Sequence, residues 1–178
     1  RLAEALASHD AALRLQPSHL AARASHAGLL YRLGRYEDAI VSSNRVLDAK
    51  PDHADALTHR GNAQLELKQH VAALESFGRA LRANPNHLSA LYGRGNAQAA
   101  LKQFSEAVET YNRLLAAMPA NPDVLNNRGI MLTQLGRDED AVADFCHAIS
   151  VAPERPDSFV NRAKVLLQRQ LPADALAD

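Results

Sequence analysis

The sequence predicts an all-α solenoid, a stack of antiparallel helix pairs. Its main support is a proline that recurs with a fixed step of 34 residues, at Pro17, Pro51, Pro85, Pro119 and Pro153. Three further residue columns keep the same step. A fixed period of this length is typical of a repeat array. Such an array buries the apolar face of each repeat against its neighbours and offers an extended binding surface rather than a catalytic pocket.

The three further columns consist of alanines, of small residues and of large aliphatic residues. They are Ala5, Ala39, Ala73, Ala107, Ala141 and Ala175; Ala27, Gly61, Gly95, Gly129 and Ala163; and Leu13, Leu47, Leu81, Leu115 and Ile149. A residue with little side chain lets two helix axes approach, and a large neighbour fills the groove between them. The columns therefore predict closely packed helices.

The elements follow in order from this register. Residues 1–19 predict a half-repeat that holds a second helix only, and residues 20–53 and 54–87 each predict a full helix pair. Gly34 of residues 20–53 and Gly136 of residues 122–155 fall in the turn between the two helices of their repeats, where glycine adopts a positive φ at low cost. The chain begins at Arg1, without methionine and inside a helical pattern, so we expect a segment of a longer protein.

The clearest repeat spans residues 88–121. The inner face of its first helix is expected to consist of Leu88, Leu91, Gly95, Gln98 and Leu101, which are spaced three or four apart. The second helix is predicted to begin near Phe104, with Glu106 in its first turn, where a carboxylate suits the helix dipole. Pro119 cannot continue that helix, and Asn121 can cap the next one.

Residues 122–155 predict another full pair, and residues 156–178 predict a truncated one. Pro122 and Pro156 stand at the first position of their helices, where the missing N–H costs nothing. The last repeat is cut within a helix that begins near Pro172. Exposed apolar faces at the two truncated ends predict end-to-end self-association.

Bulk composition limits the function classes. The 178 residues include 20 basic and 20 acidic side chains, so the formal net charge of zero argues against nucleic acid and membrane partners. No apolar run approaches the ~20 residues that span a bilayer. The lone Cys146 cannot form an internal disulfide, and we expect this thiol to be buried or half-buried. We expect a cytoplasmic protein, and an arginine-rich composition that is typical of bacterial genes.

Histidines raise the question of a metal site. His19, His53 and His87 recur with the 34-residue step, two positions after the prolines. Equivalent positions of stacked repeats lie about 10 Å apart, whereas zinc needs nitrogen ligands at ~2.0–2.1 Å. We therefore predict loop residues near helix caps, with no metal and no cofactor. Phosphate loops, paired carboxylates and nucleophile motifs are also absent, which predicts a non-catalytic segment.

These repeats resemble the tetratricopeptide repeat. The features that carry the resemblance are the small residue in the first helix, the alanine early in the second, an aromatic residue four positions later (Phe77, Tyr111, Phe145) and the terminal proline. The resemblance covers essentially the whole chain and implies a right-handed superhelix. The aromatic column is interrupted at His9 and Ser43, so the N-terminal end is expected to pack less well.

The bulky position of the first helix also departs from the family, in which it holds tryptophan. Here its occupants are Arg23, Leu57, Leu91, Leu125 and Phe159.

Family members bind extended peptides or helices in a concave groove lined by their first helices. The resemblance therefore implies a protein-interaction scaffold whose groove positions are Ser25, Tyr31, His59, Asn62, Tyr92, Asn96, Asn126, Asn127, Ile130, Asn161 and Lys164. Amides can pair with any peptide backbone, and tyrosines pack at low entropy cost. The alternative is that these are only solvated polar positions.

The sequence bears on two narrower functions. Chaperone-tail binding is disfavoured because Tyr92, Asp123 and Asp157 stand where positive charge would be required. Strings such as Ala-Leu-Glu-Ser at residues 73–76 resemble repeats found ahead of bacterial O-linked N-acetylglucosaminyltransferase-like domains. The alternative function is thus the substrate-recognition arm of a larger enzyme whose catalytic domain lies outside this chain.

An arginine column precedes the small-residue column, at Arg60, Arg94, Arg128 and Arg162. It could form a basic ladder for a phosphate or carboxylate ligand. It could instead lie in the seams between helices and pair with acids of the second helices, for which Glu75, Glu109 and Asp144 are the candidates. The string Asn127-Arg128-Gly129 is common in bacterial repeats of this family, which favours the structural role.

Overall fold

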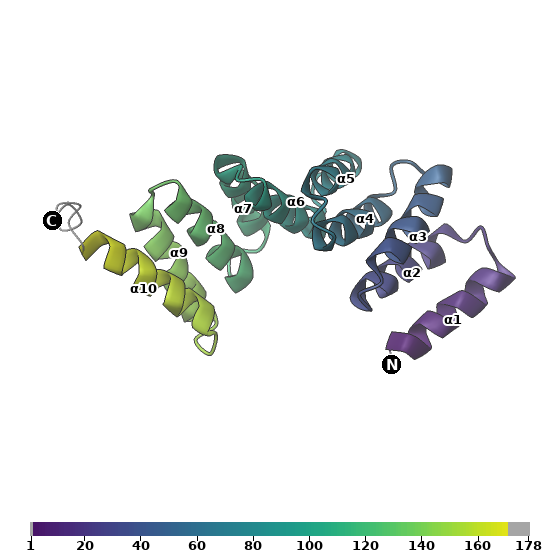
Figure 1. Ribbon diagram of the computed structural model, residues 1–178, viewed down its shortest axis with the longest axis horizontal. Helices are drawn as coiled ribbons and strands as arrows, with labels where there is room; N and C mark the ends of the chain where they lie inside the picture. The colour runs from purple at the N-terminus through teal and green to yellow at the C-terminus, as the bar shows by residue number, and fades with distance from the viewer. Residues whose placement is uncertain (1, 171–178) are drawn as a thin grey trace. The chain divides into compact units, whose positions relative to one another are not determined.

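The computed structural model describes residues 2–170, which form ten α-helices and, within that range, no strand (Figure 1). In chain order, α1 to α10 span Leu2–Leu15, Leu20–Arg32, Tyr36–Ala49, Ala54–Glu66, His70–Ala83, Leu88–Ala100, Phe104–Ala117, Pro122–Gln134, Asp138–Val151 and Pro156–Gln170. The all-α prediction is confirmed. The helix expected near Pro172, with Ala175, lies outside the described residues. None of the described helices is long and apolar enough to cross a membrane.

The helices form two compact units, residues 1–101 and residues 102–178. In the first unit, α2 to α6 pack in sequence, and α2, α4 and α6 also contact one another in order. In the second, α8 packs against α7 and α9, and α10 contacts both α8 and α9. Within each unit, the first helix of one repeat therefore touches the first helix of the next. The predicted single array and its repeat boundaries stay a prediction.

The histidine column caps helices. The Nδ1 atom of His19 accepts a hydrogen bond from the backbone N–H of Ala22 at 3.1 Å, and His53 and His87 do the same for α4 and α6. Asn121 caps α8 in the same way. Each histidine cap satisfies one of the N–H groups that a helix start leaves without a partner, and Asn121 satisfies two. The predicted place of these histidines, near the cap of the next helix, is confirmed.

The turns inside the repeats share one left-handed residue. Gly34 and Gly136 have φ of 74° and 70°, as the sequence predicts. Lys68 and Lys102 take the equivalent place in their repeats with φ of 59°. A side chain in this conformation costs about 1–2 kcal/mol. Two repeats therefore carry strain that the glycines avoid.

The small-residue column holds the aromatic rings of the second helices. A Cβ atom on Gly61 would lie 2.8 Å from the Phe77 ring, and one on Gly129 would lie 2.6 Å from the Phe145 ring. Both phenylalanines are essentially fully buried. The Phe77 ring also lies against Gly93 of the next repeat. Close contact with aromatic rings thus explains the glycines at these two positions of the column, whereas the sequence predicted that large aliphatic residues fill the groove.

Two other core positions pack less well than these glycine–ring contacts. Ser43 replaces the aromatic residue in the first full repeat, and its hydroxyl is buried without a hydrogen-bond partner among the described residues. Leaving a buried hydroxyl unsatisfied costs about 1–3 kcal/mol, in keeping with weaker packing at the N-terminal end. Leu88, predicted for the inner face of its helix, is 38% exposed because it is the first residue of α6.

Candidate functional site

The first helices are α2, α4 and α6 in the first unit and α8 and α10 in the second, and the first-helix face of each unit is the surface of these helices that carries the predicted groove residues, eleven in all. In the first unit these are Ser25, Tyr31, His59, Asn62, Tyr92 and Asn96, and in the second Asn126, Asn127, Ile130, Asn161 and Lys164. Ser25 and Lys164 are exposed, and all the others are partly exposed. All eleven side chains thus reach the surface. Their role in binding stays a prediction.

In the second unit an amide cluster joins two repeats. The side-chain oxygen of Asn126 on α8 accepts hydrogen bonds from the Ser158 hydroxyl at 3.1 Å and from the Asn161 amide at 3.0 Å, both on α10. These bonds use neither the NH₂ group of Asn126 nor the oxygen of Asn161. A peptide backbone could pair with this donor and this acceptor.

In the first unit two tyrosines and an acid form a second cluster. The rings of Tyr31 and Tyr36 lie 5.8 Å apart, and the Tyr31 hydroxyl donates to Glu66 at 3.3 Å. Burial and the neighbouring Glu66 carboxylate raise the pKa of Tyr31, so the phenol stays neutral. The ring is therefore held as a neutral, amphipathic contact on the first-helix face.

A third cluster consists of two histidines and a carboxylate on α4 and at the start of α6. The His59 ring lies against Gly28, where a Cβ would be only 2.9 Å away, and burial lowers the pKa of His59. His87 donates from Nε2 to Asp55 at 3.0 Å, and this hydrogen bond lowers the pKa of the Asp55 carboxyl. Among the described residues, no group of three or more such side chains could hold a metal ion.

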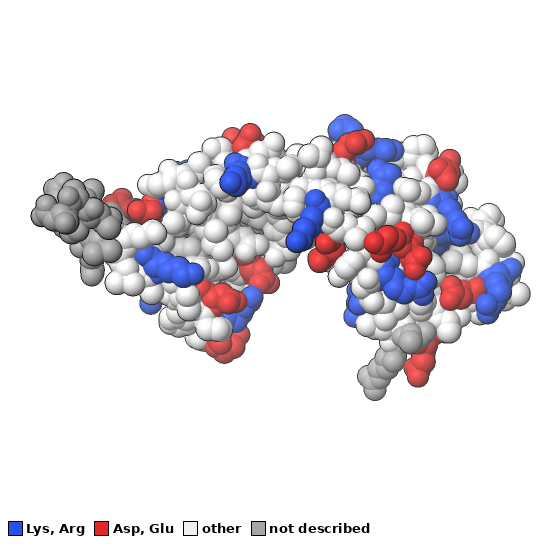
Figure 2. Space-filling view, in the orientation of Figure 1, with Lys and Arg blue, Asp and Glu red and all other residues white. Residues whose placement is uncertain are grey.

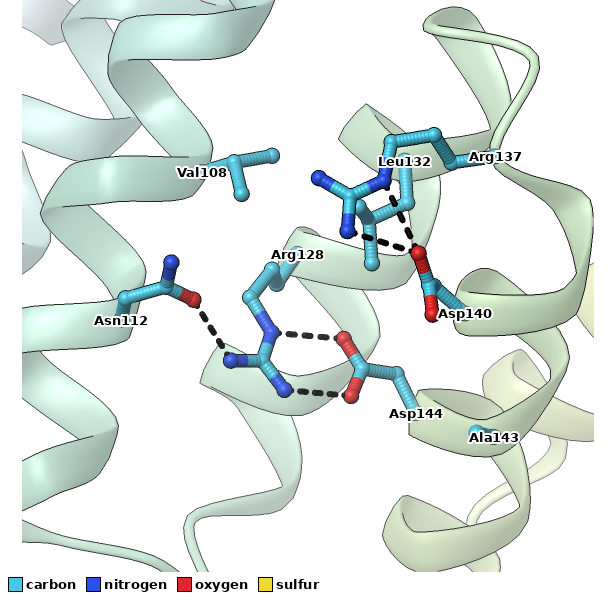
Figure 3. A pocket seen from close by; sticks show the side chains of 8 residues that line it. All are labelled: Val108, Asn112, Arg128, Leu132, Arg137, Asp140, Ala143 and Asp144. Carbon is cyan, nitrogen blue, oxygen red and sulfur yellow. Dashed lines mark hydrogen bonds and ion pairs between the residues drawn. The ribbon is translucent and has the colours of Figure 1, made fainter.

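Two arginines of the column, Arg60 and Arg128, lie in seams between successive second helices. Arg128 on α8 makes a bidentate ion pair with Asp144 on α9, at 2.6 and 2.7 Å, and donates to Asn112 on α7 at 2.6 Å (Figure 3). The Asp144 side chain is only 8% exposed. One guanidinium thus ties the second helices of two adjacent repeats together, and the pairing predicted with Asp144 is confirmed.

Arg60 shows the same geometry with other partners. It donates to Ser76 on α5 at 3.0 Å and to Asn44 on α3 at 3.1 Å. Glu75, a predicted acidic partner, makes no hydrogen bond to Arg60 among the described residues: Ser76 faces the seam, whereas Glu75 is exposed at the neighbouring position of α5 and acts on the guanidinium through its charge alone. Consecutive helical residues point about 100° apart. Burial lowers the pKa of the Arg60 guanidinium.

The remaining seams vary the same theme. His26 takes the arginine position on α2: its Nδ1 lies 3.0 Å from the Ser42 hydroxyl and its Nε2 3.0 Å from Asp10 on α1. The Ser42 hydroxyl in turn donates to the backbone carbonyl of Arg23 at 3.2 Å. Arg94 occupies the position on α6 and is partly exposed.

The prediction that the Cys146 thiol is buried or half-buried is wrong. The thiol is exposed rather than buried, and it accepts from Arg162 on α10 at 3.3 Å. The position is the one that Asn44 and Asn112 take in other seams, at the outer edge of a second helix. The Arg162 guanidinium also lies 5.7 Å from the centre of the Phe159 ring. The thiol is therefore a seam residue.

Two of the seams between helices contain similar cavities, which the sequence analysis did not predict. A cavity of about 270 Å³ lies between α7, α8 and α9, and one of about 220 Å³ lies between α1, α2 and α3. Each has an ion pair at its edge, Arg137 with Asp140 in the former and Arg35 with Asp38 in the latter. The signal was present as the string Leu-Gly-Arg-x-Glu-Asp-Ala at residues 33–39 and 135–141.

Charges of both signs are mixed over the visible surface. Lys and Arg side chains lie among Asp and Glu on the face drawn in Figure 2. Attraction to a polyanion requires a large field of one sign. On that face the mixture agrees with the net charge of zero.

Comparison with known proteins identifies the repeats. Two family models, both described as tetratricopeptide repeat, match residues 64–128 and residues 122–155, and together they span just over half of the chain. No curated protein matches the sequence at a significant level.

Similar solved structures share the fold at low sequence identity. MamA from Desulfovibrio magneticus RS-1 is 19% identical with a TM-score of 0.80, and the match covers 86% of each chain. YrrB, described as a tetratricopeptide repeat protein with an unusual peptide-binding site, is 20% identical with a TM-score of 0.79, covering 95% of this chain and 87% of its own.

A tetratricopeptide repeat protein from Thermus thermophilus is 22% identical with a TM-score of 0.75, covering 94% of this chain and 91% of its own. None of these three is described as a glycosyltransferase, so the arm of a larger enzyme stays a prediction. The helix stacks, the family models and the shared fold agree with one another. The chain belongs to the tetratricopeptide repeat family.

Proposed function

We propose that this chain is a protein-interaction scaffold that binds an extended peptide along its first-helix face. The observation that carries the proposal is the Asn126–Asn161 cluster, in which one amide oxygen is held by two donors of the next repeat. Holding an amide in place reduces the side-chain entropy lost when a ligand binds. The cluster therefore presents a backbone-pairing group in a fixed orientation.

The other first-helix residues support the same function. Asn62 adds an amide on α4, and Tyr31 adds a fixed aromatic contact on α2. These groups recognise a main chain and apolar side chains rather than one charged group. The ligand class is therefore an extended peptide of low charge.

Selection from a random peptide library displayed on phage tests this function, with affinities then measured by fluorescence polarisation. Replacing Asn126 and Asn161 together by alanine should weaken a selected peptide about tenfold, since each hydrogen bond contributes about 0.5–1.5 kcal/mol. The control is Asn112→Ala, which removes an amide of a seam. If the double variant binds as well as wild type, the first-helix face is not the binding surface.

A further inference from the structure

A second cavity of the first unit gathers three arginines from three helices. It has a volume of about 270 Å³ and is lined by Asp10, Leu13, Arg14, Arg23, His26 and Arg45. Arg14 comes from α1, Arg23 from α2 and Arg45 from α3. We call these three residues and the space between them the basic cavity. It lies between α1, α2 and α3, and none of its lining residues is a predicted groove residue.

The charges around the basic cavity are not balanced. Its one lining acid, Asp10, is met by the His26 Nε2 atom at 3.0 Å. Arg23 uses one guanidinium nitrogen to donate to the carbonyl of Pro17 at 2.6 Å. Within residues 2–170, Arg14 and Arg45 form neither an ion pair nor a side-chain hydrogen bond. Because a guanidinium carries five N–H donors, most donors of the three arginines are available to a ligand.

Comparison with the other repeats shows that the basic cavity departs from the packing rule of this chain. The residues equivalent to Arg23 are Leu57, Leu91 and Leu125, which are exposed by 0%, 3% and 2%, and Phe159, which is exposed by 39%. An arginine at a position that fills the core in three other repeats forgoes apolar burial, and such local departures concentrate at functional sites. The position of Arg14 varies among the repeats: it holds Asp48 on α3, Arg82 on α5, Ala116 on α7 and Ser150 on α9.

We propose that the basic cavity binds the carboxylates of an acidic peptide segment on a partner protein. Guanidinium groups bind carboxylates with two parallel hydrogen bonds, and three guanidiniums around one opening can hold more than one acidic side chain. Leu13 offers an apolar contact beside them. A peptide is favoured over nucleic acid because the excess of positive charge is confined to this cavity, while the chain as a whole carries no net charge.

Fluorescence polarisation with a labelled hexaglutamate peptide tests this site, with hexaglutamine as the neutral probe. The variant Arg14→Gln/Arg45→Gln should bind hexaglutamate at least about tenfold more weakly, because it loses two charge-assisted contacts. The matched control is Arg32→Gln/Arg82→Gln, which has the same net charge and changes two other exposed arginines. Thermal unfolding of each variant shows that the fold is kept.

Selective loss in the Arg14/Arg45 variant, with little loss in the control, supports the site. Equal loss in both variants shows general charge attraction and overturns it, as does equal binding of hexaglutamine. Inorganic phosphate is the competitor that separates ligand sources. If phosphate binds through Arg14 and Arg45 while hexaglutamate does not bind, the ligand is a phosphate group and the acidic-peptide proposal is wrong.

Discussion

Removing the guanidinium of Arg128 should destabilise the second unit more than the same change at Arg60 destabilises the first. In Arg128→Met, the bidentate bonds to Asp144 are lost, and a carboxylate that is 8% exposed keeps its charge without its partner. Breaking a buried pair from one side costs about 3–5 kcal/mol. Because the Arg128 side chain is 23% exposed and water can partly replace it, we expect about 2–3 kcal/mol.

The matched change Arg60→Met strands no charge. Its partners are the neutral Ser76 and Asn44, and Ser76 keeps its own hydrogen bond to Gln64 at 2.7 Å. The loss of ordinary hydrogen bonds should cost only about 1 kcal/mol. The second test is Arg128→Met/Asp144→Leu, which also removes the stranded carboxylate. Replacing a buried pair by apolar residues is often neutral, so this variant should recover most of the lost stability.

Urea unfolding followed by circular dichroism measures all four proteins, compared by midpoint at equal m. The predicted order of free energy of unfolding is wild type, then the double variant and Arg60→Met, then Arg128→Met. Equal losses in the two single variants would show that the charge of Asp144 does not matter. A double variant no more stable than Arg128→Met would refute the stranded-carboxylate explanation.

Four further outcomes are expected. Gly93→Ala should cost about 1–3 kcal/mol in urea unfolding because its Cβ would lie 2.3 Å from the buried Phe77 ring, whereas Gly78→Ala, whose nearest atom is 3.9 Å away, should stabilise by about 0.5–1 kcal/mol. Lys68→Gly should raise stability by up to about 1 kcal/mol by relieving a φ of 59°, and an unchanged midpoint would argue against strain there. Burial lowers the pKa of folded His59 below the ordinary histidine value of 6.5, so the unfolded chain binds the proton more readily. The His59 contribution to stability should therefore be complete above pH 6.5 and fall on acidification toward pH 5. His59→Asn should flatten this slope of stability against pH, and an identical slope in wild type and variant would contradict the explanation. Because the apolar side chains of Leu166 and Leu167 on α10 are exposed, light scattering should show self-association at high protein concentration, and a strict monomer would count against it.

The helices, caps and turns were predictable because their signals are local. Asn121 caps a helix and Gly34 turns left-handed for reasons that lie within a few residues of each. The left-handed Lys68 was not predictable in this way, since lysine carries no preference for a positive φ. Its repeat imposes the turn, and the neighbouring contacts offset the strain. Local chemistry thus predicted where elements begin and end, but not every residue that tolerates them.

Partners across the seams could not be read from the sequence, because they depend on how the helices cross. Arg128 meets an acid and Arg60 a hydroxyl at equivalent distances along the chain, and Glu75 misses the seam by one position. Cys146 is exposed for the same reason, since the outer edge of a second helix is defined only once the next repeat is in place. A one-residue offset on a helix changes the direction of a side chain by about 100°.

The seam geometry also limits which of the sixteen arginines have side-chain donors left for a ligand. Arg60 and Arg128 are occupied by the second helices on both sides, so the column that looked like a basic ladder has few donors left for a ligand. Arg14 and Arg45 lie outside that column and form no ion pair or side-chain hydrogen bond with the described residues. A guanidinium ordered on a protein surface without a partner gains no hydrogen bond in return for its lost entropy. Arg32 and Arg82 are likewise without a partner among the described residues, but Arg14 and Arg45 line one cavity together with Arg23. If the protein recognises an anion through several arginines of its first unit, we therefore expect that contact in the basic cavity.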